Sequence, residues 1–399
     1  MTTIKTFNDF DILKEHVEKL ETLAITEPTE IQKKVIPLIL DNKNVIFQSE
    51  TGTGKTFAFL LPLLKKIDVA NKNVQLIIIA PTQELASQIK AQIQLLDFAH
   101  VALFFGGSPI KRQIEKLKEK PLVVVGTAER ILELYFLKKL KLDSCSSLVL
   151  DETDRLLSVE MKTKTLELVE ILAKHIFSKQ GKNLQLIACS ATIKENLAKQ
   201  LEKALTISTI QKTQFDLVLL PRDEVLTKNI THWAIYSEQR NKIDTLIKLL
   251  NAAKPTKALI FTSNVSQIAL IVDRLKYKKV DCAGLHAKTD KITRKQVIDR
   301  FRSGKVSLLV TSDLTARGLD IAKIDYIIQM DLPKNDDFFV HRAGRTGRAG
   351  LSGTNIVIGD AWEMEQFAKL EKRLKIVVYP KTLYNGKIVS PAVETPENE

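Results

Sequence analysis

The stretch Val45-Ile46-Phe47-Gln48-Ser49-Glu50-Thr51-Gly52-Thr53-Gly54-Lys55-Thr56 decides the fold of the first half of the chain. Its first three residues are apolar and have the character of a short buried strand. A long amphipathic pattern follows, which predicts a helix with one apolar face made of Phe59, Leu60, Leu63, Leu64 and Ile67. A strand, a glycine-containing turn with Lys-Thr, and a helix in this order predict a phosphate-binding loop.

This loop suits a triphosphate because glycines let successive backbone N–H groups point at one anion, and the helix start adds partial positive charge. Lys55 supplies a full charge for the β- and γ-phosphates, and the Thr56 hydroxyl can bind Mg²⁺. Ser49 stands where the strict pattern has glycine. We expect the nucleotide to contact Ser49, Glu50, Thr51, Gly52, Thr53, Gly54, Lys55 and Thr56.

The bulk composition narrows the class of protein. With 399 residues and 44% hydrophobic content, the chain can build two cores of ordinary domain size. Its net charge of +13 favours a polyanionic partner, nucleic acid before membrane. The three cysteines are isolated in sequence, so neither a zinc site nor a disulfide framework is indicated. Without a signal-peptide pattern or an apolar run of about 20 residues, we expect a cytoplasmic protein.

Short apolar runs alternate with helical patterns after the loop, which predicts a parallel sheet covered by helices on both faces. The expected strands in the first half are 76–80, 101–105, 122–125, 147–150 and 184–188. Those in the second half are 258–261, 280–283, 307–310, 326–329 and 355–358. We therefore expect two α/β domains at residues 1–210 and 229–380, a linker at 211–228, and a disordered polar tail at 381–399.

Chemistry in such sheets gathers where the strands end. Asp151 and Glu152 follow one expected strand, where Asp151 can hold Mg²⁺ and Glu152 can deprotonate a water. The alternative is an acidic helix start stabilised by the helix dipole. Three other strand ends offer helix starts, bare backbone and one arginine, which suit phosphodiester oxygens. These residues are Pro81, Thr82, Gly106, Gly107, Thr127 and Arg130.

The second half has no phosphate loop, but it contains the arginine-rich stretch His341-Arg342-Ala343-Gly344-Arg345-Thr346-Gly347-Arg348. Arg345 and Arg348 have the character of arginine fingers, although a solvated basic helix is the alternative. Asn241-Lys242-Ile243-Asp244 matches a guanine-specificity pattern. It lies in an amphipathic helix pattern, so we interpret it as helix surface.

In their order and spacing, these motifs resemble the DEAD-box family of ATP-dependent RNA helicases, in its compact bacterial, cold-shock type, from Phe7 to about Ile358. The resemblance implies two RecA-like lobes joined by a short linker, each with a mostly parallel sheet and helices on both faces. It implies that Phe7 stacks on adenine, and that Thr29 and Gln32 belong to the adenine-reading motif. It places Asp320 at the ribose and Arg345 and Arg348 at the γ-phosphate.

The resemblance also assigns coupling and RNA contact. Coupling of hydrolysis to unwinding is implied for Asp154, Ser190, Thr192 and His341. RNA contact is implied for the strand-end residues Pro81, Thr82, Gly106, Gly107, Thr127 and Arg130, and in the second lobe for Thr262, Arg294, Ser312 and Asp313.

The implied function is Mg-ATP hydrolysis coupled to sequence-independent binding of RNA and local separation of short duplexes. The first alternative is an ATP-gated RNA clamp with little unwinding; a DNA helicase and a GTPase are further ones. We expect a monomer, with ribosome-assembly or RNA-decay proteins as partners typical of such relatives.

The chain departs from the family pattern at a few positions. Gln83 replaces an arginine, Ala128 and Glu129 replace Pro-Gly, and Ser312 replaces a threonine while keeping the hydroxyl. Thr153 replaces an alanine, and we expect little consequence from this small change.

Overall fold

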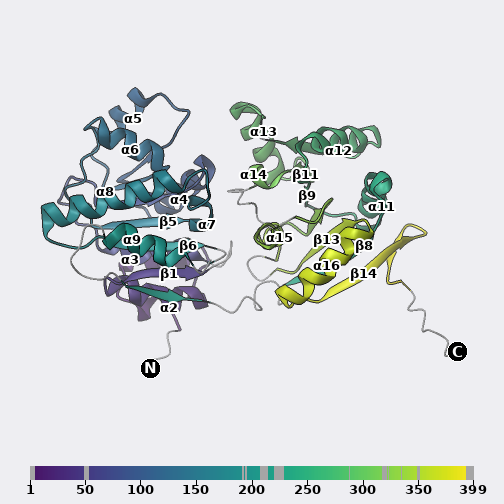
Figure 1. Ribbon diagram of the computed structural model, residues 1–399, viewed down its shortest axis with the longest axis horizontal. Helices are drawn as coiled ribbons and strands as arrows, with labels where there is room; N and C mark the ends of the chain where they lie inside the picture. The colour runs from purple at the N-terminus through teal and green to yellow at the C-terminus, as the bar shows by residue number, and fades with distance from the viewer. Residues whose placement is uncertain are drawn as a thin grey trace. The chain divides into compact units, whose positions relative to one another are not determined.

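The computed structural model describes residues 5–48, 54–190, 193, 196–206, 214–219, 229–286, 288–316, 321, 323–333, 335–347 and 351–391. The chain forms two compact units, Met1–Leu220 and Pro221–Glu399 (Figure 1). Within the described parts, no helix combines the length and the apolar character that a membrane crossing requires.

The first unit is built on a parallel sheet with the strand order β3-β4-β2-β5-β6-β1-β7. Its strands are β1 (Asn44–Gln48), β2 (Leu76–Ile79), β3 (Val101–Phe104), β4 (Val123–Gly126), β5 (Ser147–Asp151), β6 (Gln185–Ser190) and β7 (Phe215–Val218). Its helices are η1 (Phe7–Asp9), α1 (Lys14–Thr22), α2 (Glu30–Leu40), α3 (Lys55–Lys65), α4 (Gln83–Leu95), α5 (Ile110–Leu117), α6 (Ala128–Phe136), α7 (Thr153–Leu156), α8 (Lys162–Gln180) and α9 (Leu197–Thr206).

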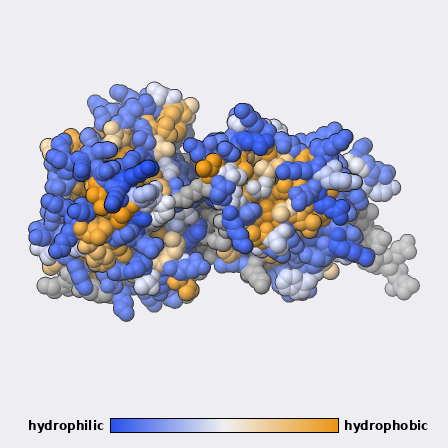
Figure 2. Space-filling view, turned by 90° about the horizontal axis from the view of Figure 1, so that it is seen from above, coloured by the Kyte–Doolittle hydropathy of each residue, from blue (hydrophilic) through white to orange (hydrophobic). Residues whose placement is uncertain are grey.

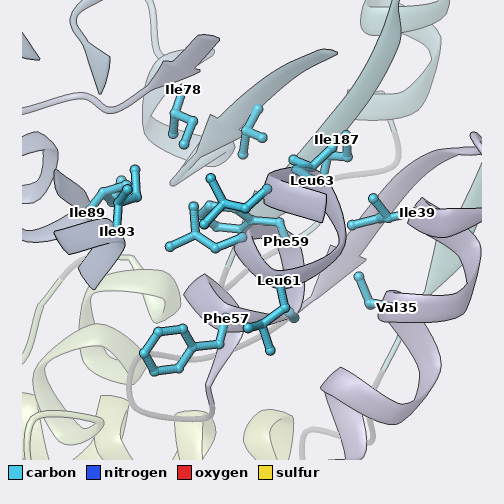
Figure 3. Packing of buried hydrophobic residues seen from close by; sticks show 14 of the residues in the cluster. Val35, Ile39, Phe57, Phe59, Leu61, Leu63, Ile78, Ile89, Ile93 and Ile187 are labelled. Carbon is cyan, nitrogen blue, oxygen red and sulfur yellow. The ribbon is translucent and has the colours of Figure 1, made fainter. Parts of the chain in front are cut away.

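Two apolar cores cover the two faces of this sheet. On one face α1 to α4 pack against the strands, as the contacts among Val35, Ile39, Phe59, Ile78 and Ile89 show (Figure 3). On the other face α6, α8 and α9 form the second core. Because both faces are covered, β2 is buried at every residue, which is why its sequence is continuously apolar.

The second unit repeats this plan with the strand order β10-β11-β9-β12-β13-β8-β14-β15, parallel except for the antiparallel last pair. Its strands are β8 (Ile230–Tyr236), β9 (Ala258–Phe261), β10 (Cys282–Leu285), β11 (Leu308–Thr311), β12 (Tyr326–Gln329), β13 (Gly353–Gly359), β14 (Val378–Tyr384) and β15 (Lys387–Val389). Its helices are η2 (Gln239–Asn241), α11 (Lys242–Ala253), α12 (Val265–Tyr277), α13 (Lys291–Arg302), α14 (Asp313–Ala316), α15 (Asp336–Ala343) and α16 (Ala361–Leu374). The guanine-like pattern lies in η2 and the start of α11, so it is helical as expected, but Lys242 is buried and donates to Met330 O, which contradicts the expectation of a helix surface for that residue.

The structure corrects two expected boundaries. The segment expected to be linker contains β7, which pairs with β1 at the sheet edge and exposes Leu217, so it lacks the continuous apolar run of a central strand. The prediction of a disordered tail is wrong for residues 381–389, because they continue β14 and form β15. The turn between them is Asn385-Gly386, both with positive φ, which is the turn that favours a tight hairpin.

Smaller shifts occur elsewhere. The strand expected at 280–283 lies at Cys282–Leu285. β8 was missed because its exposure alternates and because His232 and Trp233 interrupt its apolar pattern.

Both hydrophilic residues and clusters of hydrophobic residues lie on the face seen from above in Figure 2.

Candidate active site and RNA-facing loops

The phosphate-loop helix α3 begins immediately after a glycine in the left-handed conformation. Gly54 has φ of +84°, and a Cβ built there would lie 2.5 Å from Gln32 Nε2. Glycine is therefore required twice at this position, once for backbone conformation and once for space. Lys55 and Thr56 occupy the first turn of α3, as the sequence pattern predicts. Ser49, Glu50, Thr51, Gly52 and Thr53 lie outside the described residues.

Gln32 connects the start of α2 with this loop. Its Oε1 accepts a hydrogen bond from Thr29 N at 2.8 Å, and its Nε2 donates to Gly54 O at 2.9 Å. With 2% exposure, the Gln32 side chain is a buried bridge and not the exposed helical glutamine that its isolated position suggests. Its contact with adenine stays a prediction.

Phe7 is placed differently from the adenine-stacking expectation. Its side chain is 1% exposed and belongs to the apolar core of the first unit, with its ring centroid 6.3 Å from that of Phe10. A ring covered in this way has no free face for a base in this conformation. Burial of its large apolar surface explains the position, because a phenylalanine ring gains most when it is removed from water.

Asp151 is the centre of a buried polar cluster at the end of β5. Its Oδ1 accepts from Lys55 Nζ at 3.2 Å, from Glu152 N at 2.9 Å and from Cys189 Sγ at 3.1 Å. Burial lowers the pKa of Lys55, but the carboxylate of Asp151 outweighs this effect and raises the pKa above its usual value. Burial, reinforced by Asp151, raises the pKa of the Cys189 thiol well above its usual value. Lys55 is therefore charged and Cys189 is a neutral donor.

The second oxygen of Asp151 fits a cation. Asp151 Oδ2 is buried and has no hydrogen-bond partner among the described residues, which is costly unless a ligand satisfies it. Thr56 offers its hydroxyl from the first turn of α3. Mg²⁺ usually binds only a few protein oxygens, because phosphates and water complete its coordination shell. Glu152, which follows Asp151 directly, is 8% exposed and has the left-handed conformation, with φ of +53°.

Thr153 has a larger structural effect than we expected from its size. Its Oγ1 lies 2.8 Å from Leu150 O and 3.1 Å from Cys189 O, so the hydroxyl holds the ends of β5 and β6 together. Ser190 Oγ accepts from Asp154 N at 3.3 Å and links α7, the helix that follows β5, to the end of β6. Asp151, predicted for metal binding, and Asp154 and Ser190, predicted for coupling, therefore lie close together at the ends of β5 and β6. Of the other residues predicted for coupling, His341 belongs to the second unit and Thr192 lies outside the described residues.

The three loops predicted to face RNA follow β2, β3 and β4, which are neighbours in the sheet. Thr82 Oγ1 caps α4 by accepting from Leu85 N at 3.2 Å, and Thr127 precedes α6. Arg130 donates to Ser108 O at 3.0 Å, and its Nε lies 2.9 Å from a Glu133 carboxylate oxygen. The Arg130 side chain is only 11% exposed, and its bond to Ser108 O anchors the segment that follows the glycine turn at 106–107. Pro81 is buried, and Glu129 is exposed in the first turn of α6.

In the second unit the structure adds Arg342, to which the sequence analysis gave no role. Its Nε and Nη2 donate to the two carboxylate oxygens of Asp313 at 2.6 and 2.7 Å, and Nη1 donates to Asp331 O at 3.0 Å. Nη2 also donates to Ser263 Oγ at 2.9 Å, and the guanidinium lies 5.3 Å from the Phe261 ring centroid. Burial lowers the pKa of Arg342, but its two carboxylate neighbours raise it, so the group stays charged.

The predicted RNA-contacting residues of this unit surround that arginine. Thr262 Oγ1 lies 3.0 Å from Asp331 Oδ2, and Ser312 Oγ lies 3.0 Å from Thr315 Oγ1. Arg294 reaches the same corner by donating to Thr315 O at 3.1 Å. His341, half-buried, and Arg345, 5% exposed, lie in and just after α15. Asp320 and Arg348 lie outside the described residues.

Comparison with known proteins agrees with this architecture. The DEAD/DEAH box helicase model matches residues 29–200, and the helicase conserved C-terminal domain model matches residues 241–350. The DEAD-box ATP-dependent RNA helicase CshC of Bacillus cereus is 35% identical over 95% of this chain and 94% of its own length. The probable ATP-dependent RNA helicase YfmL of Bacillus subtilis is 33% identical over 93% of this chain and 95% of its own length.

Among solved structures, that of Dbp5 from S. cerevisiae bound to RNA and ADP BeF3 is similar, with a TM-score of 0.81 and 26% identity over 94% of this chain and 96% of Dbp5. Two parallel α/β units, the first with a lysine and a carboxylate paired at the strand ends, define a helicase-type nucleoside triphosphatase. The chain belongs to the DEAD-box family of ATP-dependent RNA helicases.

Proposed function

We propose that this helicase binds the sugar-phosphate backbone of RNA without sequence preference. It separates short duplexes locally, and this separation is coupled to hydrolysis of Mg-ATP. The observation that carries the proposal is the buried cluster in which Asp151 Oδ1 is held by Lys55, while Asp151 Oδ2 has no partner in the part of the chain that the structure describes. A site built this way is ready for a cation and phosphates.

In the proposed reaction, Lys55 moves from Asp151 toward the β- and γ-phosphates, since a nucleotide brings competing negative charge. Mg²⁺, held by Asp151 and Thr56, would neutralise charge on the phosphates. Glu152 orients a water and accepts its proton, because it is the carboxylate beside Asp151. Arg345 and Arg348 stabilise the charge that develops on the transferred phosphoryl group.

The proposed nucleotide selection belongs to Thr29 and Gln32. Gln32 uses one lone pair of Oε1 and one N–H of Nε2 within the protein, so one acceptor and one donor site remain for a base edge. Asp320 would contact the ribose. Phe7, which is buried, supports this region from the core and takes no direct part in stacking.

For RNA, the proposed contacts are the loops after β2, β3 and β4 and the corner of the second unit around Arg294, Ser312 and Asp313. Backbone groups and helix starts bind phosphates without reading bases, which supports sequence-independent binding. Coupling is proposed to pass through the links between β5 and β6, where Asp154 N donates to Ser190 Oγ. Thr192 and His341 complete the proposed coupling set.

The decisive experiment measures ATP binding, RNA-stimulated hydrolysis and duplex separation for the wild type and for Glu152→Gln. We expect the variant to bind ATP and to lose turnover, because its amide cannot accept the proton of water. Glu18→Gln, an exposed substitution on α1 of the same unit, is the control and should behave as wild type. Normal hydrolysis by Glu152→Gln would refute the assignment of the base. Wild type that binds RNA with ATP but never separates strands would replace unwinding with an ATP-gated clamp.

A further inference from the structure

A row of lysines lies along the edge of the second sheet where its strands begin. The strands β10, β11, β9 and β12 are consecutive neighbours, and each is preceded by lysine. We call this surface the lysine edge and define it by Lys254, Lys257, Lys278, Lys279, Lys305 and Lys323. All are exposed except Lys257, which is half-buried. Adjacent strands lie about 4.8 Å apart, so the row is roughly 14 Å wide.

The backbone fixes these loops side by side. Ala258 N donates to Ser307 O at 2.9 Å, and Asp325 N donates to Lys257 O at 3.0 Å, so the chain segments before β9, β11 and β12 are in direct contact. The half-buried Lys257 ammonium donates to Arg302 O at 3.2 Å and lies 5.7 Å from the Phe301 ring centroid. The edge is therefore a built surface and not a set of unrelated side chains.

The negative charge on this edge is small. The Asp325 carboxylate accepts from Thr256 N at 2.7 Å and from Lys257 N at 3.2 Å, so it is committed to the backbone. Asp281 is the acid between Lys279 and β10. Within the described ranges, no salt bridge joins any member of the lysine edge to an acid. Uncompensated lysines that share one edge add their fields and attract a polyanion.

An aromatic ring accompanies the charge. Tyr277, at the end of α12, is 79% exposed and stands next to Lys278, whose Nζ lies 5.8 Å from the ring centroid. Tyrosine so exposed gains nothing from packing against the protein, but an unpaired base can stack on it while lysines bind the neighbouring phosphates. Charge and aromatic ring together favour single-stranded nucleic acid over an acidic protein.

We propose that the lysine edge and Tyr277 form a second RNA-binding surface, separate from the corner that holds Thr262 and Ser312. Those two residues follow the carboxyl ends of β9 and β11, whereas the lysine edge lies at the amino ends of the same strands. An RNA short enough to be covered by the first surface has no nucleotides left for the second, whereas a longer strand does. The inference rests on the proposed RNA binding and adds a length-dependent anchor to it.

The test uses the full-length variant Lys254→Gln/Lys278→Gln/Lys279→Gln and single-stranded RNA of about 10 and about 40 nucleotides, since one binding surface covers only several nucleotides. Affinity is measured by fluorescence anisotropy across a salt titration. Each lost phosphate contact changes the slope of log K against log salt by about 0.7 for single strands, so the slope for the long RNA should fall by about 2. Affinity for the short RNA and the ATPase rate that it stimulates should stay at the wild-type level.

The matched control is Lys116→Gln/Lys118→Gln/Lys120→Gln, which removes the same charge from exposed positions of the first unit. Tyr277→Ala is a separate variant that should weaken only the long RNA. An unchanged slope for the long RNA, or equal loss for both RNAs, would overturn the proposal. A lower melting temperature without any change in RNA affinity would also overturn it, because the lysines would then only stabilise the C-terminal ends of helices. If the wild type binds neither RNA, the proposed function fails, and not merely this inference.

Discussion

Replacing Arg342 by leucine should destabilise the second unit strongly. Arg342 is 1% exposed and pairs with Asp313 and Asp331, whose side chains are 17% and 22% exposed. Removing the arginine leaves two largely buried carboxylates without their cation. Breaking a buried ion pair from one side costs about 3–5 kcal/mol. For a unit of this size that loss corresponds to a melting temperature lower by about 6–20 °C.

The assay is thermal unfolding of the full chain, with hydrogen exchange to assign the transition to the second unit. Arg373→Leu provides the matched control, because Arg373 forms a bidentate pair with Asp336 in the same unit but is 54% exposed. An exposed pair contributes about 0–1 kcal/mol, so this control should melt close to the wild type. Arg342→Lys keeps the charge but loses the planar fork and should fall between the two.

The reasoning is refuted if Arg342→Leu melts within the range of Arg373→Leu. That result would mean that Asp313 and Asp331 reach solvent or protons easily enough to dispense with the arginine. It would also remove the basis for regarding the corner as preorganised for RNA.

Three further predictions concern the first unit. Gln32→Ala removes the bonds to Thr29 N and Gly54 O and should raise the KM for ATP about tenfold; an unaltered KM would contradict it. Cys189→Ala removes a donor to Asp151 and should raise the Mg²⁺ concentration for half-maximal ATPase, whereas Cys189→Ser should restore it. Burial lowers the pKa of His16, so the folded state binds its proton less readily than the unfolded state. Stability should therefore fall as pH drops below about 6.5, and His16→Gln should flatten that dependence in pH-series melting curves.

The strand-and-loop framework could be predicted because its signals are local. The run at 76–79 is apolar at every position since both faces of β2 are covered, and the loop-and-helix start at Lys55 follows from its glycines. The position of Asp151 could also be predicted, because an acid at the end of a buried strand must lie at the sheet edge. These features can be predicted without knowing which strands are neighbours in the sheet.

The features that were missed depend on pairing between distant residues. The hydroxyl of Thr153 matters only because Cys189 O lies within reach, and sequence does not reveal that β5 and β6 are neighbours. Arg342 had no assigned role because its partners are 11 and 29 residues away. The hairpin after Tyr384 is a different case, since Asn385-Gly386 is a local turn signal that the expectation of a polar tail left out of account.

The buried cluster at the ends of β5 and β6 links the two kinds of chemistry proposed for this helicase. Asp151 Oδ1 is satisfied by a charged amine, a backbone N–H and a neutral thiol, so its orientation is fixed before any nucleotide arrives. When Lys55 turns to phosphates, Cys189 and the backbone still hold that oxygen. Cys189 lies directly before Ser190, whose hydroxyl accepts from Asp154 N. We propose that these contacts, from Asp151 to Cys189 and from Ser190 to Asp154, carry a change in charge at Asp151 to the residues proposed for coupling.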